Sequence, residues 1–265
     1  MTDIHPTAIV DPSAQIGDNV VIGPFSCVGG EVVIGDGVEL KSHVVLDGRT
    51  TIGRDCAIFP FASIGHRPQD LKYSGEDSVL NIGERNIIRE YVTMNPGTQG
   101  GGMETRVGDD NLFMVGAHVA HDCIVGNHVI MANNATLAGH VIVGDFAIIG
   151  GLAAVHQFCR IGRHAMIGGM SGVENDIIPY ASVMGGRASL SGLNLVGLKR
   201  RGFTKDEIGS LRVAYRQLFA EEGLLSKRIE DVAKQFPDLE AVMEIVEFIR
   251  ADSSRGLTQP RSTNG

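Results

Sequence analysis

A six-residue repeat runs along most of this chain and restricts its fold more than any other feature. An aliphatic side chain or Met or Phe recurs at every sixth position, with two interruptions, between Ile4 and Val173. A period of six matches neither an amphipathic α-helix nor one long strand. It matches short strands joined by tight corners, with the large residue pointing inward and a small residue four positions later filling the corner. The in-phase positions are Ile4, Val10, Ile16, Ile22, Val28, Ile34, Leu40, Leu46, Ile52, Ile58, Ile64, Ile82, Ile88, Met94, Val107, Phe113, Val119, Val125, Met131, Leu137, Val143, Ile149, Val155, Ile161, Ile167 and Val173.

The composition agrees with a stack of similar coils. The chain has 35 Gly, no Trp and only 5% aromatic residues, which disfavours a compact core built on large rings. Three repeats, about 18 residues, would close one triangular coil, and a parallel ladder between coils would satisfy the backbone. Cys56, Cys123 and Cys159 fall at the small corner position, so we interpret them as core residues. With Cys27 they form no CxxC pair and no metal-type spacing.

Two breaks in the repeat predict loops. They cover residues 66–80 and 99–106, and insertions in solenoids tend to lie on one face, often the binding face. We therefore predict an all-β solenoid, a parallel β-helix, over residues 1–186 with these two insertions. Residues 187–265 are predicted to form a C-terminal α-helical domain.

The repeat ends near Pro179, and the remaining sequence has helical features. Thr204 and Glu207 have the spacing of a capping box, and apolar residues then follow at helical spacing. Residues 252–265 are expected to be a disordered tail. Helices are predicted at about 205–221, 226–235 and 238–251.

The distribution of charge limits the class of partner. The net charge of -8 argues against a general nucleic-acid-binding protein. Residues 187–216 nevertheless contain seven Lys or Arg and only two acidic residues. This basic stretch indicates a polyanionic ligand or an acidic partner protein, or else a solvated helix face.

No targeting segment is evident. The N-terminal residues lack the pattern of a signal peptide, and no apolar run approaches the roughly 18 residues of a membrane helix. We expect a cytoplasmic protein with reduced thiols and no membrane insertion.

The coil length predicts which polar residues are neighbours. Adding 18 to Asp122 gives His140, and adding 18 to His121 gives Gly139. Adjacent coils lie about 4.8 Å apart. His121, Asp122, Gly139 and His140 should therefore form one patch on one wall, with His156 beside it on the next coil.

This patch would suit acyl transfer to a hydroxyl group. A neutral His121 could take the hydroxyl proton, and Asp122 could hold the imidazole in the required tautomer. The N–H of Gly139 could stabilise an oxyanion. No Ser or Cys lies in a nucleophile motif, which favours direct transfer over a covalent intermediate.

A metal site is the alternative for the same cluster. His118, His121 and His140 could imitate the three-His zinc sites of some β-helix proteins. The cluster lacks an H-x4-H spacing, so we rank metal binding below acyl transfer and expect no metal. Metal analysis of the purified protein separates the two hypotheses.

Six short motifs occur in a fixed order along the chain: QDLKYSG (69–75), HVAHDC (118–123), ANNATLAGHV (132–141), FAIIGG (146–151), AVHQFC (154–159) and GLKRRGF (197–203). Together they resemble the UDP-N-acetylglucosamine acyltransferase family, and the resemblance covers essentially the full chain. That resemblance implies a left-handed β-helix, a homotrimer with active sites between neighbours, and transfer of a 3-hydroxyacyl group from acyl carrier protein to the 3-hydroxyl of the sugar. No bound cofactor is implied, because 4′-phosphopantetheine arrives on the donor.

The resemblance also implies individual roles. His121 would be the general base, Asp122 its orienting partner and Gly139 the oxyanion donor. Gly151, Gly169 and Met170 would lie along the acyl groove. Gly169 at its end has no side chain, which favours a donor of about 12–14 carbons. The residues implied to bind the nucleotide sugar or the donor are Gln69, Asp70, Lys72, His118, His140, His156, Gln157, Asn194 and Arg200.

Three departures from the family pattern leave the acceptor open. Val196 stands where relatives often carry an acid, the segment MNPGT at residues 94–98 replaces a more usual His-Arg pair, and Arg187 lies near the acyl groove. A 3-amino sugar is therefore an alternative acceptor. Rival hypotheses are the related N-acyltransferase, an acetyl-CoA-dependent acetyltransferase, a zinc-binding carbonic-anhydrase-like protein and a non-catalytic scaffold.

Overall fold

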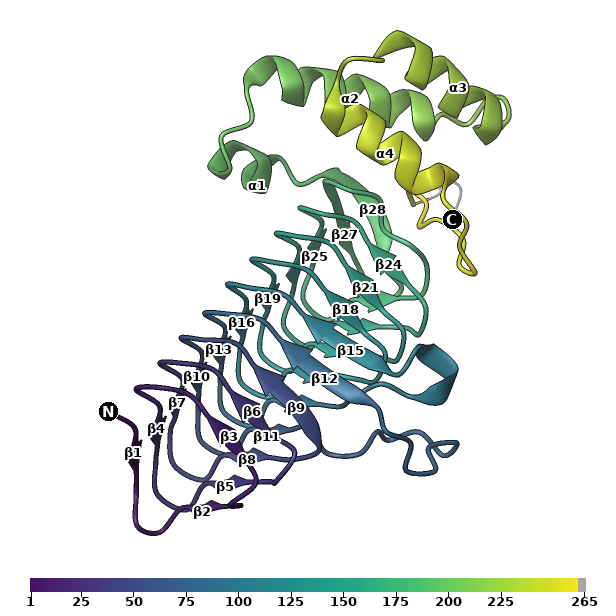
Figure 1. The fold of residues 1–265 in the computed structure, drawn as a ribbon. Helices are drawn as coiled ribbons and strands as arrows, with labels where there is room; N and C mark the ends of the chain where they lie inside the picture. Colours follow the sequence, from purple (N-terminus) through teal and green to yellow (C-terminus); the bar gives the residue numbers. More distant parts are fainter. Residues whose placement is uncertain (262–265) are drawn as a thin grey trace.

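The chain forms one solenoid that carries a group of helices on its C-terminal end (Figure 1). The structure is a computed structural model and describes residues 1–261. Successive short strands belong in turn to three sheets, so each coil is triangular, and strands of neighbouring coils pair in parallel. The predicted fold is confirmed: the solenoid is a left-handed parallel β-helix with a C-terminal helical domain.

The three sheets have 11, 9 and 8 strands. Sheet 1 contains β1 (Asp3–Ile4), β4 (Val21–Ile22), β7 (Glu39–Leu40), β10 (Ala57–Ile58), β13 (Ile87–Ile88), β16 (Leu112–Phe113), β19 (Ile130–Met131), β22 (Ile148–Ile149), β25 (Met166–Ile167), β27 (Ala181–Met184) and β28 (Ser189–Leu193). Sheet 2 contains β2 (Ile9–Val10), β5 (Cys27–Val28), β8 (Val45–Leu46), β11 (Ser63–Ile64), β14 (Thr93–Met94), β17 (His118–Val119), β20 (Thr136–Leu137), β23 (Ala154–Val155) and β26 (Gly172–Val173). Sheet 3 contains β3 (Gln15–Ile16), β6 (Val33–Ile34), β9 (Arg49–Ile52), β12 (Val79–Ile82), β15 (Glu104–Val107), β18 (Ile124–Val125), β21 (Ile142–Val143) and β24 (Arg160–Ile161).

The repeat produces this core directly. From Ile22 onward the in-phase residues are buried, and the small residues four positions later, such as Cys56 and Cys123, are buried with them. Burying one such aliphatic side chain contributes about 1.5–3 kcal/mol. The corners place many non-glycine residues in the left-handed backbone region, among them Asp122 and His140. The parallel ladder offsets this local strain by pairing the backbone of every coil with its neighbours.

Both insertions leave the solenoid at the same corner. The first joins β11 to β12, and the second joins β14 to β15 and contains a short 3-10 helix, η1 (Gln99–Gly101). Each therefore connects sheet 2 to sheet 3, in two successive coils. The next coil at this corner joins β17 to β18, which is where His121 and Asp122 lie. The fold thus brings both loops to the predicted histidine patch.

The end of the solenoid differs in part from the prediction. Beyond Pro179, β27 continues sheet 1 and β28 returns antiparallel to it. Thr204 and Glu207 form the predicted capping box. The short helix α1 was not predicted, because six residues are too few to show helical periodicity. The helices are α1 (Leu195–Arg200), α2 (Lys205–Leu218), α3 (Leu225–Gln235) and α4 (Glu240–Arg250).

The prediction of a disordered tail is wrong for residues 252–261. The Asp176 amide donates to the Gly256 carbonyl and the Thr258 amide to the Asp176 carbonyl, both at 2.8 Å. The Asp176 carboxylate, buried and paired with Arg160, accepts the Ser253 hydroxyl at 2.7 Å. The tail is ordered because it satisfies backbone groups at the last coil, a contact that local composition does not reveal. Residues 262–265 lie outside the described residues.

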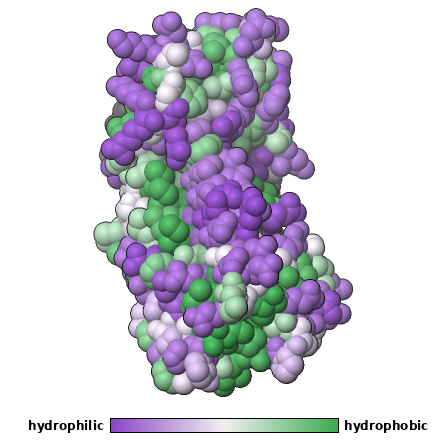
Figure 2. All heavy atoms as spheres, turned by 60° about the vertical axis from the view of Figure 1, so that its left-hand side comes forward, coloured by the Kyte–Doolittle hydropathy of each residue, from purple (hydrophilic) through white to green (hydrophobic). Residues whose placement is uncertain are grey.

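The surface is unevenly apolar. On the face seen in Figure 2, apolar side chains gather over the solenoid and toward its N-terminal end, whereas the helical end is mainly hydrophilic. Exposed apolar residues in the N-terminal half of the solenoid include Ile9, Val21, Phe25, Phe61 and Tyr91. No helix within residues 1–261 is both long and apolar enough to cross a membrane.

Candidate active site

The predicted patch exists at one corner of the solenoid. Asp122, His140 and Phe158 occupy the same corner position in three successive coils, with φ values of 59°, 63° and 66°. The rings of His140 and Phe158 stack with their centroids 4.4 Å apart, and those of His121 and His140 meet edge to face at 5.1 Å. Stacking of equivalent positions, coil on coil, brings these side chains together.

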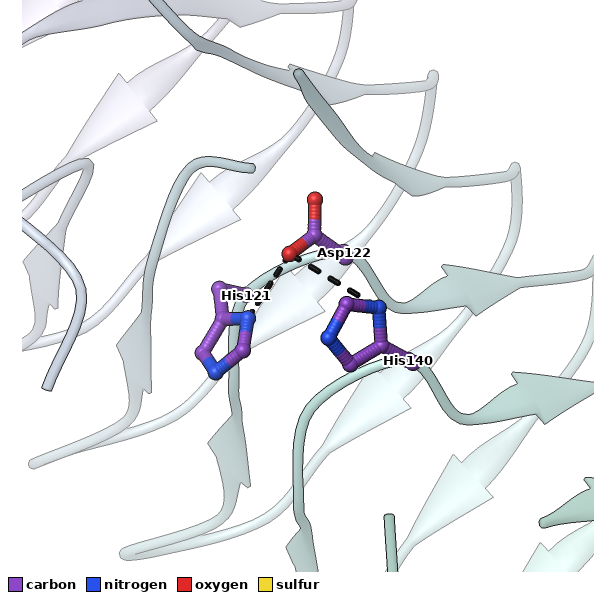
Figure 3. A group of neighbouring side chains, drawn as sticks. All are labelled: His121, Asp122 and His140. Carbon is purple, nitrogen blue, oxygen red and sulfur yellow. Dashed lines mark hydrogen bonds and ion pairs between the residues drawn. The ribbon is translucent and has the colours of Figure 1, made fainter. Parts of the chain in front are cut away.

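His121 and Asp122 are hydrogen-bonded neighbours. Figure 3 shows both imidazoles turned toward one carboxylate oxygen: His121 Nδ1 lies 2.7 Å from Asp122 Oδ2, and His140 Nδ1 lies 3.8 Å from the same oxygen. Both residues of the closer pair are buried, and the Asp122 side chain is fully so. A carboxylate only accepts hydrogen bonds, so His121 Nδ1 carries a proton, and in the neutral imidazole Nε2 is then the nitrogen with the free lone pair.

Gly139 lies directly against the His121 ring. A Cβ atom built at Gly139 would come within 2.5 Å of His121 Cε1, so a side chain at this position would displace the imidazole. Within residues 1–261 the amide of Gly139 donates to no backbone or side-chain acceptor. A free N–H donor therefore stands beside the imidazole.

The second insertion encloses Asp122 from the other side. The Thr98 amide donates to Asp122 Oδ1 at 2.8 Å, and the Thr98 hydroxyl donates to Oδ2 at 2.6 Å. The Asp122 amide in turn donates to Thr105 Oγ1 at 2.7 Å. Sequence reasoning missed Thr98. The sequence did contain one indication of its position, because the second break in the repeat begins at residue 99, directly after Thr98.

The first insertion contributes the predicted sugar-binding residues. Asp70, Lys72, Thr98, His140 and Phe158 line one cleft of about 380 Å³, together with neighbouring loop residues. The structure thus brings Asp70 and Lys72 to the histidine patch. Gln69, in the same loop, is exposed and does not line this cleft.

Two further histidines are biased toward the neutral form. Burial lowers the pKa of His118, whose Nδ1 lies 2.7 Å from the Thr93 hydroxyl. Burial also lowers the pKa of His140, opposed by the nearby Asp122 carboxylate. At neutral pH both side chains can therefore offer one donor and one acceptor to a ligand.

The ordered tail reaches His156 and Gln157. Arg255 donates from Nη2 to His156 Nδ1 at 2.7 Å and from Nε to the Gln157 carbonyl at 2.9 Å. Because a guanidinium only donates, His156 Nδ1 must accept, which leaves the proton on Nε2. Arg255 was missed because the tail was expected to be disordered.

Asn194 and Arg200 lie at a different corner. Asn194 caps α1, its side chain accepting from the Gly197 amide at 3.0 Å and donating to the His164 carbonyl at 3.0 Å. His164 turns the chain from β24 to β25, from sheet 3 to sheet 1, whereas His121 lies between sheets 2 and 3. Arg200 is exposed near the end of α1. One chain therefore does not bring these two residues to His121.

The three acyl-groove candidates occupy the other edge of sheet 2. Gly151 follows β22 and Gly169 follows β25, so both lie where sheet 1 passes into sheet 2. A Cβ at Gly169 would lie 3.2 Å from the Gly151 carbonyl, so the two glycines stack. Met170 is 73% exposed beside them. The three form a strip on the surface of one chain.

One group could hold a metal ion by distance alone. The ligand-type atoms of His121, Asp122 and His140 lie within 4.8 Å of one another. This set includes Asp122 in place of His118, so it differs from the three-His alternative. The His121–Asp122 hydrogen bond uses Nδ1 as a donor, which is the arrangement of a general base with its orienting acid.

Comparison with known proteins identifies the class. Residues 176–258 match the family model described as "Udp N-acetylglucosamine O-acyltransferase; Domain 2". Residues 4–48 and 104–139 match the model described as bacterial transferase hexapeptide. The fold and site therefore define an acyltransferase of the hexapeptide-repeat class.

Full-length relatives narrow this class to one family. A Caulobacter vibrioides protein named acyl-[acyl-carrier-protein]–UDP-N-acetylglucosamine O-acyltransferase is 54% identical, covering 97% of this chain and 98% of the relative. A Rickettsia canadensis protein of the same name is 53% identical, covering 96% of each chain. The solved UDP-N-acetylglucosamine acyltransferase of Campylobacter jejuni superposes with a TM-score of 0.92 at 41% identity, over 98% of this chain and all of that one. The chain belongs to the acyl-[acyl-carrier-protein]–UDP-N-acetylglucosamine O-acyltransferase family.

Proposed function

We propose that this enzyme transfers a 3-hydroxyacyl chain from acyl carrier protein to the 3-position of UDP-N-acetylglucosamine, the first step of lipid A biosynthesis. The observation that carries the proposal is the buried His121–Asp122 pair with Gly139 against the imidazole. The names of the relatives support the donor and the acceptor. The donor brings its own 4′-phosphopantetheine, so the proposal includes no resident cofactor and no metal.

The geometry suggests the order of proton transfers. His121 Nε2 takes the proton of the sugar 3-hydroxyl as its oxygen attacks the thioester carbonyl. The Asp122 carboxylate stabilises the resulting imidazolium through Nδ1. The free amide of Gly139 donates to the oxyanion of the tetrahedral intermediate. The carbon–sulfur bond then breaks, and the imidazolium returns its proton to the leaving thiolate.

The remaining roles follow from position. Asp70, Lys72 and His140 line the cleft beside the base and would hold the sugar and its phosphates. We propose that His118, His156 and Gln157 contact the nucleotide sugar or the acyl donor. The strip formed by Gly151, Gly169 and Met170 would support the acyl chain. The basic stretch of residues 187–216 would attract the acidic carrier protein, mainly by raising the association rate.

We further propose a homotrimer with shared active sites. Arg200 and Asn194 are implied to serve the nucleotide, yet in one chain they lie at a different corner from His121. A neighbouring chain in a closed cyclic assembly could supply them. The exposed apolar surface of the solenoid supports such contacts (Figure 2).

A mixture of two impaired variants tests the shared site. His121→Ala and Arg200→Ala should each be impaired alone. Coexpressed in equal amounts, they should recover activity, because about a quarter of the interfaces would carry both native residues. Measured activity per site should approach that fraction of wild type. A mixture no more active than its components, or an active monomer by light scattering, would contradict the proposal.

The function itself is tested by product analysis. The enzyme is given an equal mixture of UDP-N-acetylglucosamine and the corresponding UDP-2,3-diamino sugar, with acyl carrier protein thioesters of several chain lengths. We expect mass spectrometry to show an ester at the 3-position, with chains of about 12–14 carbons preferred. Acylation of the diamino sugar alone would assign the 3-amino acceptor instead. Transfer from acetyl-CoA alone would overturn the donor assignment.

A further inference from the structure

The proposed mechanism requires the Asp122 carboxylate to keep one orientation, and residues of the second insertion contact this carboxylate. Its side chain is fully buried, and within residues 1–261 no Lys or Arg lies within 4.0 Å of it. A buried carboxylate without a cation needs hydrogen bonds to remain stable. Its oxygens must also be oriented so that one faces His121 Nδ1.

Thr98 meets both needs. Its amide donates to Oδ1 and its hydroxyl to Oδ2, so one residue contacts both oxygens of Asp122. Two donors placed on different oxygens fix the plane of the carboxylate, which otherwise turns readily about its terminal torsion. In this orientation Oδ2 faces His121 Nδ1 at 2.7 Å.

The hydroxyl of Thr98 does not serve its own helix. Thr98 is the N-cap residue of η1, where a Thr side chain ordinarily accepts a hydrogen bond from the first turn. Here the side chain makes no capping hydrogen bond and donates to Asp122 instead. The side chain is thus used for the carboxylate rather than for local helix stability.

The rest of the insertion holds Thr98 in place and closes over the acid. The Thr98 carbonyl accepts from the amides of Gly101 and Met103 at 3.1 and 3.0 Å. A Cβ at Gly101 would lie 2.0 Å from Asp122 Cγ, so only glycine allows the loop to pass this close. Glu76 of the first insertion accepts from the Gln99 amide at 3.2 Å, which joins the two loops.

We propose that Thr98 is a positioning residue for the transfer reaction: it orients Asp122, which in turn sets the tautomer and direction of His121. This inference rests on the proposed function, because it concerns how the proposed base is held. It also gives the loop that contains Thr98 and Gly101 a role, which is to cover the Asp122 carboxylate and hold it in one orientation.

Removal of the hydroxyl tests the inference. Thr98→Val keeps the amide donor and the shape but loses the bond to Oδ2. We expect kcat to fall about 10–100-fold with the KM for the UDP-sugar changed less than about twofold. Thr98→Ser, which restores the donor, should return kcat to within about threefold of wild type. Thr50→Val is the matched control, since Thr50 is also buried and donates its hydroxyl to a loop carbonyl, that of Asp47.

A double-variant cycle separates positioning from a purely structural role. If Thr98 acts through Asp122, adding Thr98→Val to Asp122→Asn should lower kcat by less than about threefold. Equal loss in both backgrounds, or wild-type kcat in a folded Thr98→Val enzyme, would overturn the inference. Should that variant not fold, Thr98→Ala is measured by the same criteria. The proposed base fails separately, if His121→Ala leaves kcat unchanged, and the proposed function fails if product analysis shows no acyl group at the 3-position of UDP-N-acetylglucosamine.

Discussion

Replacing His121 with Ala should lower kcat by about 10²–10⁴-fold, with the KM for the UDP-sugar changed far less. A sugar hydroxyl is a poor nucleophile at neutral pH, so a base that removes its proton during the attack accelerates the reaction. The structure supports this role, because His121 Nδ1 is hydrogen-bonded to Asp122, which leaves Nε2 as the nitrogen that can accept a proton. Steady-state kinetics with both substrates varied measures the two constants separately.

Two further variants make the test specific. Asp122→Asn should cost less than His121→Ala, because it disturbs the orientation of the imidazole without removing the base. His128→Ala is a matched control: His128 is a partly exposed histidine at another corner, stacked on Phe146. It should leave kcat near wild type. If His121→Ala instead raised KM and left kcat intact, His121 would be a binding residue and the base assignment would be withdrawn.

Replacing Gly139 with Ala should lower kcat by about 100-fold or more, at the scale of losing an oriented catalytic group. The added Cβ would lie 2.5 Å from His121 Cε1 and 2.7 Å from Nε2, distances that force the ring or the backbone to move. The imidazole would then lose its alignment with Asp122, and the amide of residue 139 would move away from the oxyanion. Kinetics together with a crystal structure of the variant would show the displaced ring.

A second glycine provides the control for this substitution. Gly209 lies on the exposed face of α2, and a Cβ there meets nothing within 4 Å. Gly209→Ala should therefore leave kcat unchanged and stabilise the protein by about 0.5–1 kcal/mol through helix propensity. A Gly139→Ala enzyme with wild-type kcat would show that the ring of His121 can move without loss, and the proposed geometry of catalysis would be wrong.

Much of the fold could be predicted because it is periodic. A repeat of six puts the same residue type in the same place in every coil, so Ile22, Leu40 and Ile58 are buried by one rule. The same rule placed Asp122 over His140 and His121 over Gly139, since residues one coil apart stack. Position in the repeat was thus enough to predict the two central contacts of the candidate site.

The contacts that the repeat could not predict are made by segments of the chain that lie outside the repeat. Thr98 is 24 residues from Asp122, which is not a whole coil, because the insertion shifts the register. Arg255 reaches His156 from 99 residues away, through a tail whose composition indicates disorder. Asn194 and Arg200 were assigned to the same ligand as His121 by resemblance, yet one chain holds them at different corners.

The sequence by itself therefore determined the parts of the protein that depend on local periodicity: the solenoid, its inward residues and the stacked His121, Asp122, Gly139 and His140. Only the tertiary structure decided how the loops and the tail return to that corner. The physical reason is that these contacts are made by irregular backbone, whose hydrogen bonds depend on distant partners rather than on neighbours in sequence. The hydrogen bond from the Thr98 hydroxyl to the Asp122 carboxylate is one of these contacts between irregular backbone segments and distant partners.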